Sequence, residues 1–204
     1  DSKGNVVEHS YFDSEGLTKK KYILKYDSRG NVVEESNYKS DGSLWSKHIY
    51  KYDSNGNKVE ELNYDSDGSL NKSKDISKYD SNGNQIEELV YDSDGKLYWK
   101  ITFKYDSNGN MVEEYLYDSD GKLDRKYIYK YDSNGNRIER SYYGSDGSLE
   151  KKDIFKYDSN GNQIEELGYH SDGMSLKYKS ISKYDTKNRI IEGRIYNYEL
   201  KFGE

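Results

Sequence analysis

The chain has 204 residues, of which 34% are charged and 32% hydrophobic, and its formal net charge is -6. Because both signs are interspersed, this composition excludes a dedicated nucleic-acid or anionic-membrane binder, and the absence of cysteine excludes disulfides and thiolate metal sites. The low apolar content excludes a thick aliphatic core. The 24 tyrosines still allow a thin fold, because each ring is apolar while its hydroxyl can stay hydrated.

A repeated turn motif organises the whole chain. Segment 51–57, Lys-Tyr-Asp-Ser-Asn-Gly-Asn, recurs almost unchanged, and its glycine marks a period of 26 or 27 residues. A second motif, Asp-Ser-Asp-Gly or a variant, lies between successive copies of the first. Residues 1–204 are therefore predicted to form one repeat domain of about seven and a half double-strand units. The marker glycines are Gly4, Gly30, Gly56, Gly83, Gly109, Gly135 and Gly161 for the first motif, and Gly16, Gly42, Gly68, Gly95, Gly121, Gly147 and Gly173 for the second.

The residues between the motifs have the pattern of β-strands. In segment 57–64 the spacing of Val59 and Leu62 would also suit a helix, but so short a segment between glycine turns cannot form an isolated helix. In segment 96–105 apolar or aromatic residues alternate with mostly polar ones, which is typical of a strand. The alternation predicts one face with Leu97, Trp99, Ile101, Phe103 and Tyr105 and an opposite face with Tyr98, Lys100, Thr102 and Lys104.

The motifs themselves have the chemistry of tight hairpin turns. An Asp or Asn side chain opens a type I turn, and glycine suits the left-handed position of the bulge that follows. Asn188 stands where the next glycine is expected, and Asn is the next best residue at positive φ. The first motif gives eight turns, counting the one at Asn188, and the second gives seven. Fourteen strands lie between these turns and one follows the last, so about fifteen strands are predicted, each antiparallel to its neighbour.

The predicted fold class is all-β: an antiparallel up-and-down meander of about fifteen strands in a single-layer, open, twisted sheet. A closed sheet and a sheet that coils into a solenoid-like form are the alternatives. No membrane insertion is expected, because the chain lacks an apolar run of about 18 residues and because Lys100 and Glu61 place charges at mid-strand.

Tyrosines at equivalent repeat positions are predicted to line up across the sheet. Cross-strand aromatic pairs, Lys–Glu pairs and lysine stems lying over tyrosine rings would then stabilise a sheet that has no conventional core. The first predicted row contains Tyr26, Tyr52, Tyr79, Tyr105, Tyr131, Tyr157 and Tyr184, and the second contains Tyr38, Tyr64, Tyr91, Tyr117, Tyr143 and Tyr169.

The last residues depart from the repeat. Segment 190–196 keeps the strand period, whereas segment 197–204 carries no turn motif. A terminal cap over residues 197–204 is one interpretation, because exposed sheet edges invite aggregation, and a simple chain terminus is the other.

The first motif resembles the YD repeat of bacterial Rhs-type and teneurin-like proteins. The residues that carry the resemblance are Tyr50-Lys51-Tyr52-Asp53-Ser54-Asn55-Gly56-Asn57, and segments 103–106, 129–132 and 155–158 match the same pattern. The resemblance covers nearly the whole chain and implies long coiled β-sheets that can form shells around toxin cargo. The regular Asp-Ser-Asp-Gly turn departs from that family. A looser likeness is to the MORN-like Tyr/Gly hairpin repeats.

Candidate chemical sites are few. The Asp-rich turns begin like calcium loops but have glycine at the fourth position and lack the final bidentate Glu, so turn chemistry explains them better. His9, His48 and His170 lie in distant repeats, without ligand spacing. Residues copied in every repeat do not form the unique constellation that catalysis needs, so we expect no enzyme, no catalytic residues, no metal and no cofactor.

The candidate ligand surface is aromatic. Trp45 and Trp99 break the repeat, and strict alternation puts them on opposite faces. Together with the first tyrosine row, namely Tyr26, Tyr52, Tyr79, Tyr105, Tyr131, Tyr157 and Tyr184, they are the residues predicted to contact a glycan or protein partner, because aromatic rings stack on sugars and suit recognition surfaces.

Three functions are compatible with these features. The first is a non-enzymatic spacer, stalk or scaffold of a bacterial secreted or cell-surface protein. The second is a tyrosine-rich glycan- or protein-binding module, and the third is an intracellular antitoxin- or immunity-like protein. Edge-to-edge self-association is also expected to be easy for such a sheet. A signal peptide on the full-length protein would favour the first two over the third.

Overall fold

The computed structural model describes residues 1–198, except for the side chains of residues 71–73. It consists of fifteen β-strands joined by short turns, and the described residues contain no helix that could span a membrane. The strands are β1 (Glu8–Phe12), β2 (Thr18–Tyr26), β3 (Val32–Tyr38), β4 (Leu44–Tyr52), β5 (Lys58–Tyr64), β6 (Leu70–Tyr79), β7 (Gln85–Tyr91), β8 (Leu97–Tyr105), β9 (Met111–Tyr117), β10 (Leu123–Tyr131), β11 (Arg137–Tyr143), β12 (Leu149–Tyr157), β13 (Gln163–Tyr169), β14 (Leu176–Tyr184) and β15 (Ile190–Asn197).

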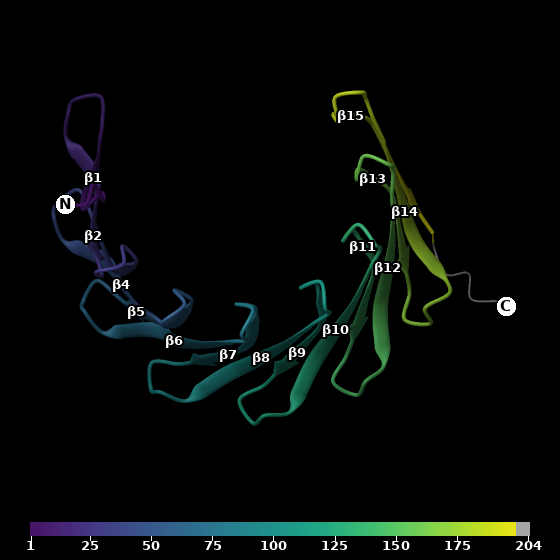
Figure 1. The fold of residues 1–204 in the computed structure, drawn as a ribbon, viewed down its shortest axis with the longest axis horizontal. Helices are drawn as coiled ribbons and strands as arrows, with labels where there is room; N and C mark the ends of the chain where they lie inside the picture. The colour runs from purple at the N-terminus through teal and green to yellow at the C-terminus, as the bar shows by residue number, and fades with distance from the viewer. Residues whose placement is uncertain (199–204) are drawn as a thin grey trace. The chain divides into compact units, whose positions relative to one another are not determined.

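The strands follow one another across a single open antiparallel sheet in the order of the sequence (Figure 1). This arrangement confirms the predicted up-and-down meander. The chain divides into two compact units, Asp1–Lys100 and Ile101–Glu204, and β8 crosses the boundary between them. Within each unit the backbone contacts between described strands link consecutive strands only, as expected for hairpins joined by tight turns. Of the proposed cap at 197–204, only Asn197 and Tyr198 lie within the described residues.

The turns have the predicted geometry. In the turn that follows β4, the Gly56 amide donates to the Asp53 carbonyl at 3.2 Å, and Gly56 has φ of 89°. The Asp53 carboxylate accepts bonds from the amides of Asn55 and Asn57, both at 2.9 Å, and from the Asn57 side chain at 2.9 Å. Asn188 has φ of 58°, which confirms that it replaces glycine at the left-handed position.

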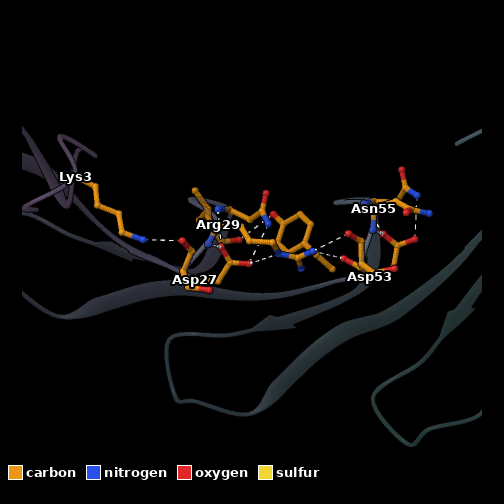
Figure 2. A network of polar contacts seen from close by, with 11 residues as sticks. Lys3, Asp27, Arg29, Asp53 and Asn55 are labelled. Atoms are coloured by element: carbon orange, nitrogen blue, oxygen red, sulfur yellow. Dashed lines mark hydrogen bonds and ion pairs between the residues drawn. The ribbon is translucent and has the colours of Figure 1, made fainter.

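Some turns along one edge of the first unit are also joined to each other (Figure 2). Lys3 donates to the Ser28 carbonyl at 2.6 Å, and Arg29 donates to the Asp53 and Ser54 carbonyls at 2.8 and 3.1 Å. Both residues precede the marker residue of the first motif, where Asn55 and the next four copies carry a shorter Asn and the last copy carries Lys187. Long basic side chains at this position therefore link consecutive repeats.

A β-bulge lies at each hairpin end and interrupts the alternation of side chains. Between β4 and β5, Lys51 pairs with Glu60 but Tyr52 pairs with Lys58, so Val59 is the extra residue. At the other end of a hairpin, Tyr38 pairs with Leu44, and the same Tyr–Leu pairing recurs through the sheet. The 27-residue repeat from Gly56 to Gly83 places its additional residue inside β6, where Leu62 pairs with Lys74 and Tyr64 pairs with Leu70.

The sheet has almost no dry interior. Among the described residues, the buried hydrophobic side chains are Val90, Tyr129 and Phe155 alone. Most remaining strand residues are half-buried, and several lysine ammonium groups lie 4.8 to 5.6 Å from the centres of tyrosine rings. This agrees with the predicted single layer, in which cross-strand pairs replace a core.

Candidate functional site

One face of the sheet carries a regular array of ion pairs, which we name the ladder face. Glu60 lies between two lysines, with Lys51 at 2.8 Å and Lys74 at 3.6 Å. The Lys51 ammonium holds the pKa of Glu60 below its ordinary value. The same arrangement recurs as Lys25–Glu34–Lys47 and Lys78–Glu87–Lys100 in the first unit, and as Lys130–Glu139–Lys152 and Lys156–Glu165–Lys179 in the second. This repetition indicates a structural role for the ladder face.

The first tyrosine row is used for holding neighbouring hairpins together. The Tyr52 hydroxyl donates to the Val32 carbonyl at 2.9 Å, just beyond Glu34, where the β3–β4 pairing begins. The hydroxyl thereby gives a hydrogen-bond donor to the Val32 carbonyl, which lies beyond the last residue pair of the β3–β4 register. Burial raises the pKa of the Tyr52 hydroxyl. Equivalent bonds run from Tyr26 to Val6, Tyr79 to Lys58, Tyr131 to Met111, Tyr157 to Arg137 and Tyr184 to Gln163, at 2.7 to 3.0 Å.

Tyr105 has the same position at the end of β8. In this row the hydroxyls of the six tyrosines above are already engaged within the fold, so a ligand could use only the exposed parts of their rings. The row as a ligand surface stays a prediction.

The tyrosine bonds have a measurable energetic consequence. Tyr131→Phe removes the 2.9 Å bond to the Met111 carbonyl and leaves that carbonyl without its donor. We expect the free energy of unfolding to fall by about 1 kcal/mol, the typical value for one such hydrogen bond. Urea denaturation would measure this loss. Tyr11→Phe is the matched control, because Tyr11 is 51% exposed in β1; an equal effect of the two substitutions would show that the bond contributes nothing.

The face opposite the ladder face, which we name the variable face, carries several positions that differ from repeat to repeat. In the second unit it holds a closed polar cluster around Asp153, which is only 1% exposed. Arg140 donates to Asp153 at 2.7 Å through its Nη2 atom, and Lys151 lies 3.2 Å away. The Tyr178 hydroxyl donates to Glu166 at 2.6 Å and contacts Asp153 at 3.1 Å.

Asp153 is the largest fully buried side chain among the described residues, and the chemistry of its cluster is that of a closed network. Burial, and then the bond to Glu166, raise the pKa of the Tyr178 hydroxyl, so the phenol keeps its proton at neutral pH. Because Asp153 is fully covered, a substrate could not reach its carboxylate. We therefore interpret the cluster as a stabilising network rather than a reaction centre.

The first unit has an open groove on its variable face, which we name the Trp99 groove. It has a volume of about 940 Å3, and its walls include Leu70, Asp75, Glu88, Val90, Tyr98 and Trp99. The rings of Tyr98 and Trp99 are 4.7 Å apart and inclined by 41°. Asp65 and Asp92 add two carboxylates at the turns. Burial raises the pKa of Glu88, and the charge of Asp75 raises it further.

The groove corrects one expectation about side-chain direction. Strict alternation assigned Tyr98 and Trp99 to opposite faces, but both rings line this groove and contact each other. The bulges at the equivalent ends of β4 and β10 show the physical reason, because an extra residue there interrupts the alternation. Trp45 lies elsewhere in the first unit, 53% exposed, with the Lys20 ammonium 5.5 Å from its ring centre.

Sequence reasoning missed Asp75, Glu88 and Val90 as groove residues. For Asp75 and Val90 the signal was available as a departure from the repeat, since positions that vary between copies are free of the shared structural role, whereas Glu88 has Glu at the equivalent position of most repeats. Among the described residues, no group of three or more His, Asp or Glu side chains is placed to hold a metal ion. The His48 ring contacts the Asn63 side chain and lies 3.9 Å from Glu61.

No protein-family model matches the chain, and no curated protein matches it. Among solved structures, the chain is similar to part of the Photorhabdus luminescens Tc holotoxin pore, with 15% identity over 87% of this chain and a TM-score of 0.62. A TcdB2–TccC3 structure matches 94% of this chain and 13% of that chain at 13% identity, with a TM-score of 0.49. A porin-like protein from Bacteroides uniformis matches 97% of this chain and 91% of that one at 10% identity, with a TM-score of 0.47.

The chain spans 9% of the length of the holotoxin chain that it matches. At 15% identity the likeness establishes the fold alone. It agrees with a repeated antiparallel β-sheet of the kind that occurs in toxin-complex proteins.

Proposed function

We propose that this chain is a non-enzymatic structural repeat module of the YD-repeat type, and that it serves as a spacer or scaffold in a bacterial secreted or cell-surface protein. The observation that carries the proposal is that the repeated residues serve the fold itself. The turn aspartates close hairpins, the ladder glutamates bind lysines of both neighbouring strands, and the tyrosine hydroxyls join adjacent hairpins.

Two further observations support this proposal. Within each unit the backbone contacts between described strands are local, so repeats can be added or removed without disturbing a shared core. The similar solved chain belongs to a holotoxin pore, which is compatible with a module of a secreted protein.

A repeat-deletion experiment tests the modular role. Removing residues 31–56 deletes β3 and β4 and joins Gly30 to Asn57, so Lys25 of β2 would meet Glu60 of β5 and restore a ladder pair. We expect this protein to remain folded, with a urea m-value lower by about one eighth, because the m-value scales with the surface that unfolding exposes. Circular dichroism and urea titration would measure both quantities.

The matched control removes half a repeat. Deleting residues 31–42 removes one strand and one turn, which puts Ser46 in the place of Glu34 opposite Lys25 and turns Lys47 to the other face of the sheet. We expect this protein to lose cooperative unfolding or to aggregate. If the full-repeat deletion fails in the same way as the half-repeat deletion, the modular role is refuted.

A further inference from the structure

Arg137 of β11 holds its guanidinium against two aromatic rings on the variable face of the second unit. The guanidinium carbon lies 5.7 Å from the ring centre of Tyr129 in β10 and 5.4 Å from that of Phe155 in β12. Both aromatic residues are buried. Because the face of an aromatic ring attracts a cation, the rings of the two neighbouring strands keep the guanidinium in place.

The guanidinium has no anionic partner within the described part of the chain. Its Nε atom is buried without a hydrogen-bond partner, and no carboxylate of the described residues lies within ion-pair distance of it. Two carboxylates of the same face are bound to tyrosines instead. Glu114 accepts from the Tyr129 hydroxyl at 2.9 Å, and Glu166 accepts from the Tyr178 hydroxyl at 2.6 Å. A partly enclosed cation without an anion is energetically unfavourable, so an added anion would stabilise Arg137.

The equivalent residues of other repeats show which partner Arg137 lacks. Lys58 in β5 forms an ion pair at 2.5 Å with Glu61, three residues further along the strand. Gln163 in β13 donates at 3.4 Å to Glu166, which is again three residues further along. In these repeats the side chain at this position therefore contacts a glutamate of its own strand.

Strand β11 departs from this arrangement. The residue three positions after Arg137 is Arg140 rather than glutamate, and it binds Asp153 of the neighbouring strand β12 at 2.7 Å. Asp153 also has the Lys151 ammonium at 3.2 Å, so two cations already compensate its charge. Arg137 is thus a positioned cation whose usual glutamate has been replaced by a second arginine.

From these observations we propose that Arg137 binds a carboxylate of an acidic segment in a partner protein. Its two Nη groups donate to both carboxylate oxygens, in the bidentate geometry that a guanidinium favours. One uncompensated cation matches the single charge of a glutamate or aspartate side chain. The carboxylates of Glu114 and Glu166 on the same face would repel the second charge of a phosphate. The inference does not depend on the role of the chain as a spacer.

The burial of the two rings favours a protein segment over an acidic sugar as the occupant. Sugars are bound by stacking on exposed aromatic faces. Tyr129 and Phe155 expose only 8% and 5% of their surface, and both rings are already covered by Arg137. A glutamate or aspartate side chain needs no free ring face, because its carboxylate alone pairs with the guanidinium.

NMR spectroscopy gives a direct test, because ring currents from Tyr129 and Phe155 shift the Nε–H resonance of Arg137. In 15N-labelled protein this resonance is assigned by its loss in Arg137→Gln. The probe is the acetylated, amidated peptide Gly-Glu-Gly, and its control is the same peptide with glutamine, a neutral isostere, in place of glutamate. At constant ionic strength we expect a saturable shift with the glutamate peptide and affinity at least about tenfold lower for the glutamine peptide, because the ion pair is lost.

Three variants locate the site, with the backbone amide resonances of Tyr129 and Phe155 reporting on binding and on folding. Arg137→Gln introduces the residue that β7 and β13 carry at this position and is expected to weaken binding at least about tenfold. Arg137→Lys introduces the residue of β5, keeps the charge and loses the bidentate contact, so binding should weaken at least about threefold. Lys122→Gln removes an equal charge from a turn where the side chain is 78% exposed, and we expect less than about a twofold change.

Three results would overturn the proposal. The first is equal affinity for the glutamate and glutamine peptides, or equal affinity of Arg137→Gln and the unchanged protein for the glutamate peptide. The second is higher affinity for inorganic phosphate than for the glutamate peptide. The third is a shift of the Arg137 Nε–H resonance with glucuronate but not with the glutamate peptide, which would identify an acidic sugar rather than a protein segment as the occupant.

Discussion

Gly168→Ala is expected to lower the free energy of unfolding by about 2–4 kcal/mol, because overpacking and lost hydrogen bonds add together at this site. Gly168 in β13 pairs directly with Tyr178 in β14, and the tyrosine ring lies over the glycine. A Cβ atom added at Gly168 would stand 2.0 Å from Cε1 of Tyr178. The ring would have to leave, and its bonds to Glu166 and Asp153 would be lost.

The structure offers both a control and a rescue for this substitution. Gly193→Ala in β15 is the matched control, because nothing lies within 4 Å of the added Cβ atom, and we expect a change within about 0.5 kcal/mol. Adding Tyr178→Ser to Gly168→Ala removes the clash and is expected to restore part of the lost stability. Thermal and urea unfolding would measure all three proteins. If Gly168→Ala is as mild as Gly193→Ala, the ring does not hold the position described.

Acid is expected to unfold the protein through its repeated carboxylates. Lysine partners lower the pKa of the ladder residues Glu34, Glu60, Glu87 and Glu165, whose ordinary value is 4.5. In the turns, bonds from asparagine side chains lower the pKa of Asp27, Asp53, Asp80, Asp106, Asp132 and Asp158, whose ordinary value is 3.8.

The direction of the pH effect follows from these lowered values. A carboxylate whose pKa is lower in the folded state contributes its stability above the unfolded pKa and loses it as the pH falls through the folded pKa. The melting temperature should therefore be nearly constant above about pH 5.5 and fall steeply from about pH 4.5 downward, because many equivalent groups titrate together. Thermal melts between pH 3 and pH 8 would measure the profile.

A single substitution measures the contribution of one ladder carboxylate to this acid effect. Glu60→Gln is expected to lower the melting temperature at pH 7 and to make the profile shallower, because it removes one carboxylate whose folded pKa is lowered. Glu15→Gln, on an exposed turn, is the charge-matched control and is expected to leave the profile unchanged. A melting temperature that stays constant from pH 7 to pH 3 would show that neither set of carboxylates stabilises the sheet.

The two faces of the sheet differ in how strictly they repeat. The ladder face repeats the same Lys–Glu–Lys contacts with little variation, whereas the variable face holds the Asp153 cluster and the Trp99 groove. A ladder of identical contacts gives every repeat the same support. Individual repeats can then carry different side chains on the other face without losing their place in the sheet.

Local chemistry made much of this fold predictable from the sequence. Each turn is set by residues within five positions of one another, such as Asp53 and Asn57, and each strand by the alternation between two turns. Asn188 could be placed at a left-handed position because Asn is the residue that best replaces glycine there. Sequential antiparallel pairing followed, because tight turns leave each strand no other neighbour.

Only the tertiary structure showed which residues meet across strands. The bulges change the side-chain direction at hairpin ends, so Tyr98 and Trp99 share one groove although the alternation assigns them to opposite faces. Arg140 meets Asp153, and Asp75 meets Glu61, because of a register that is set by turn length and bulge position together. A change of one residue in turn length or bulge position moves side chains to the other face of the sheet. The periodic pattern of the sequence therefore determined the sheet, whereas the register of the folded chain determined which side chains meet on it.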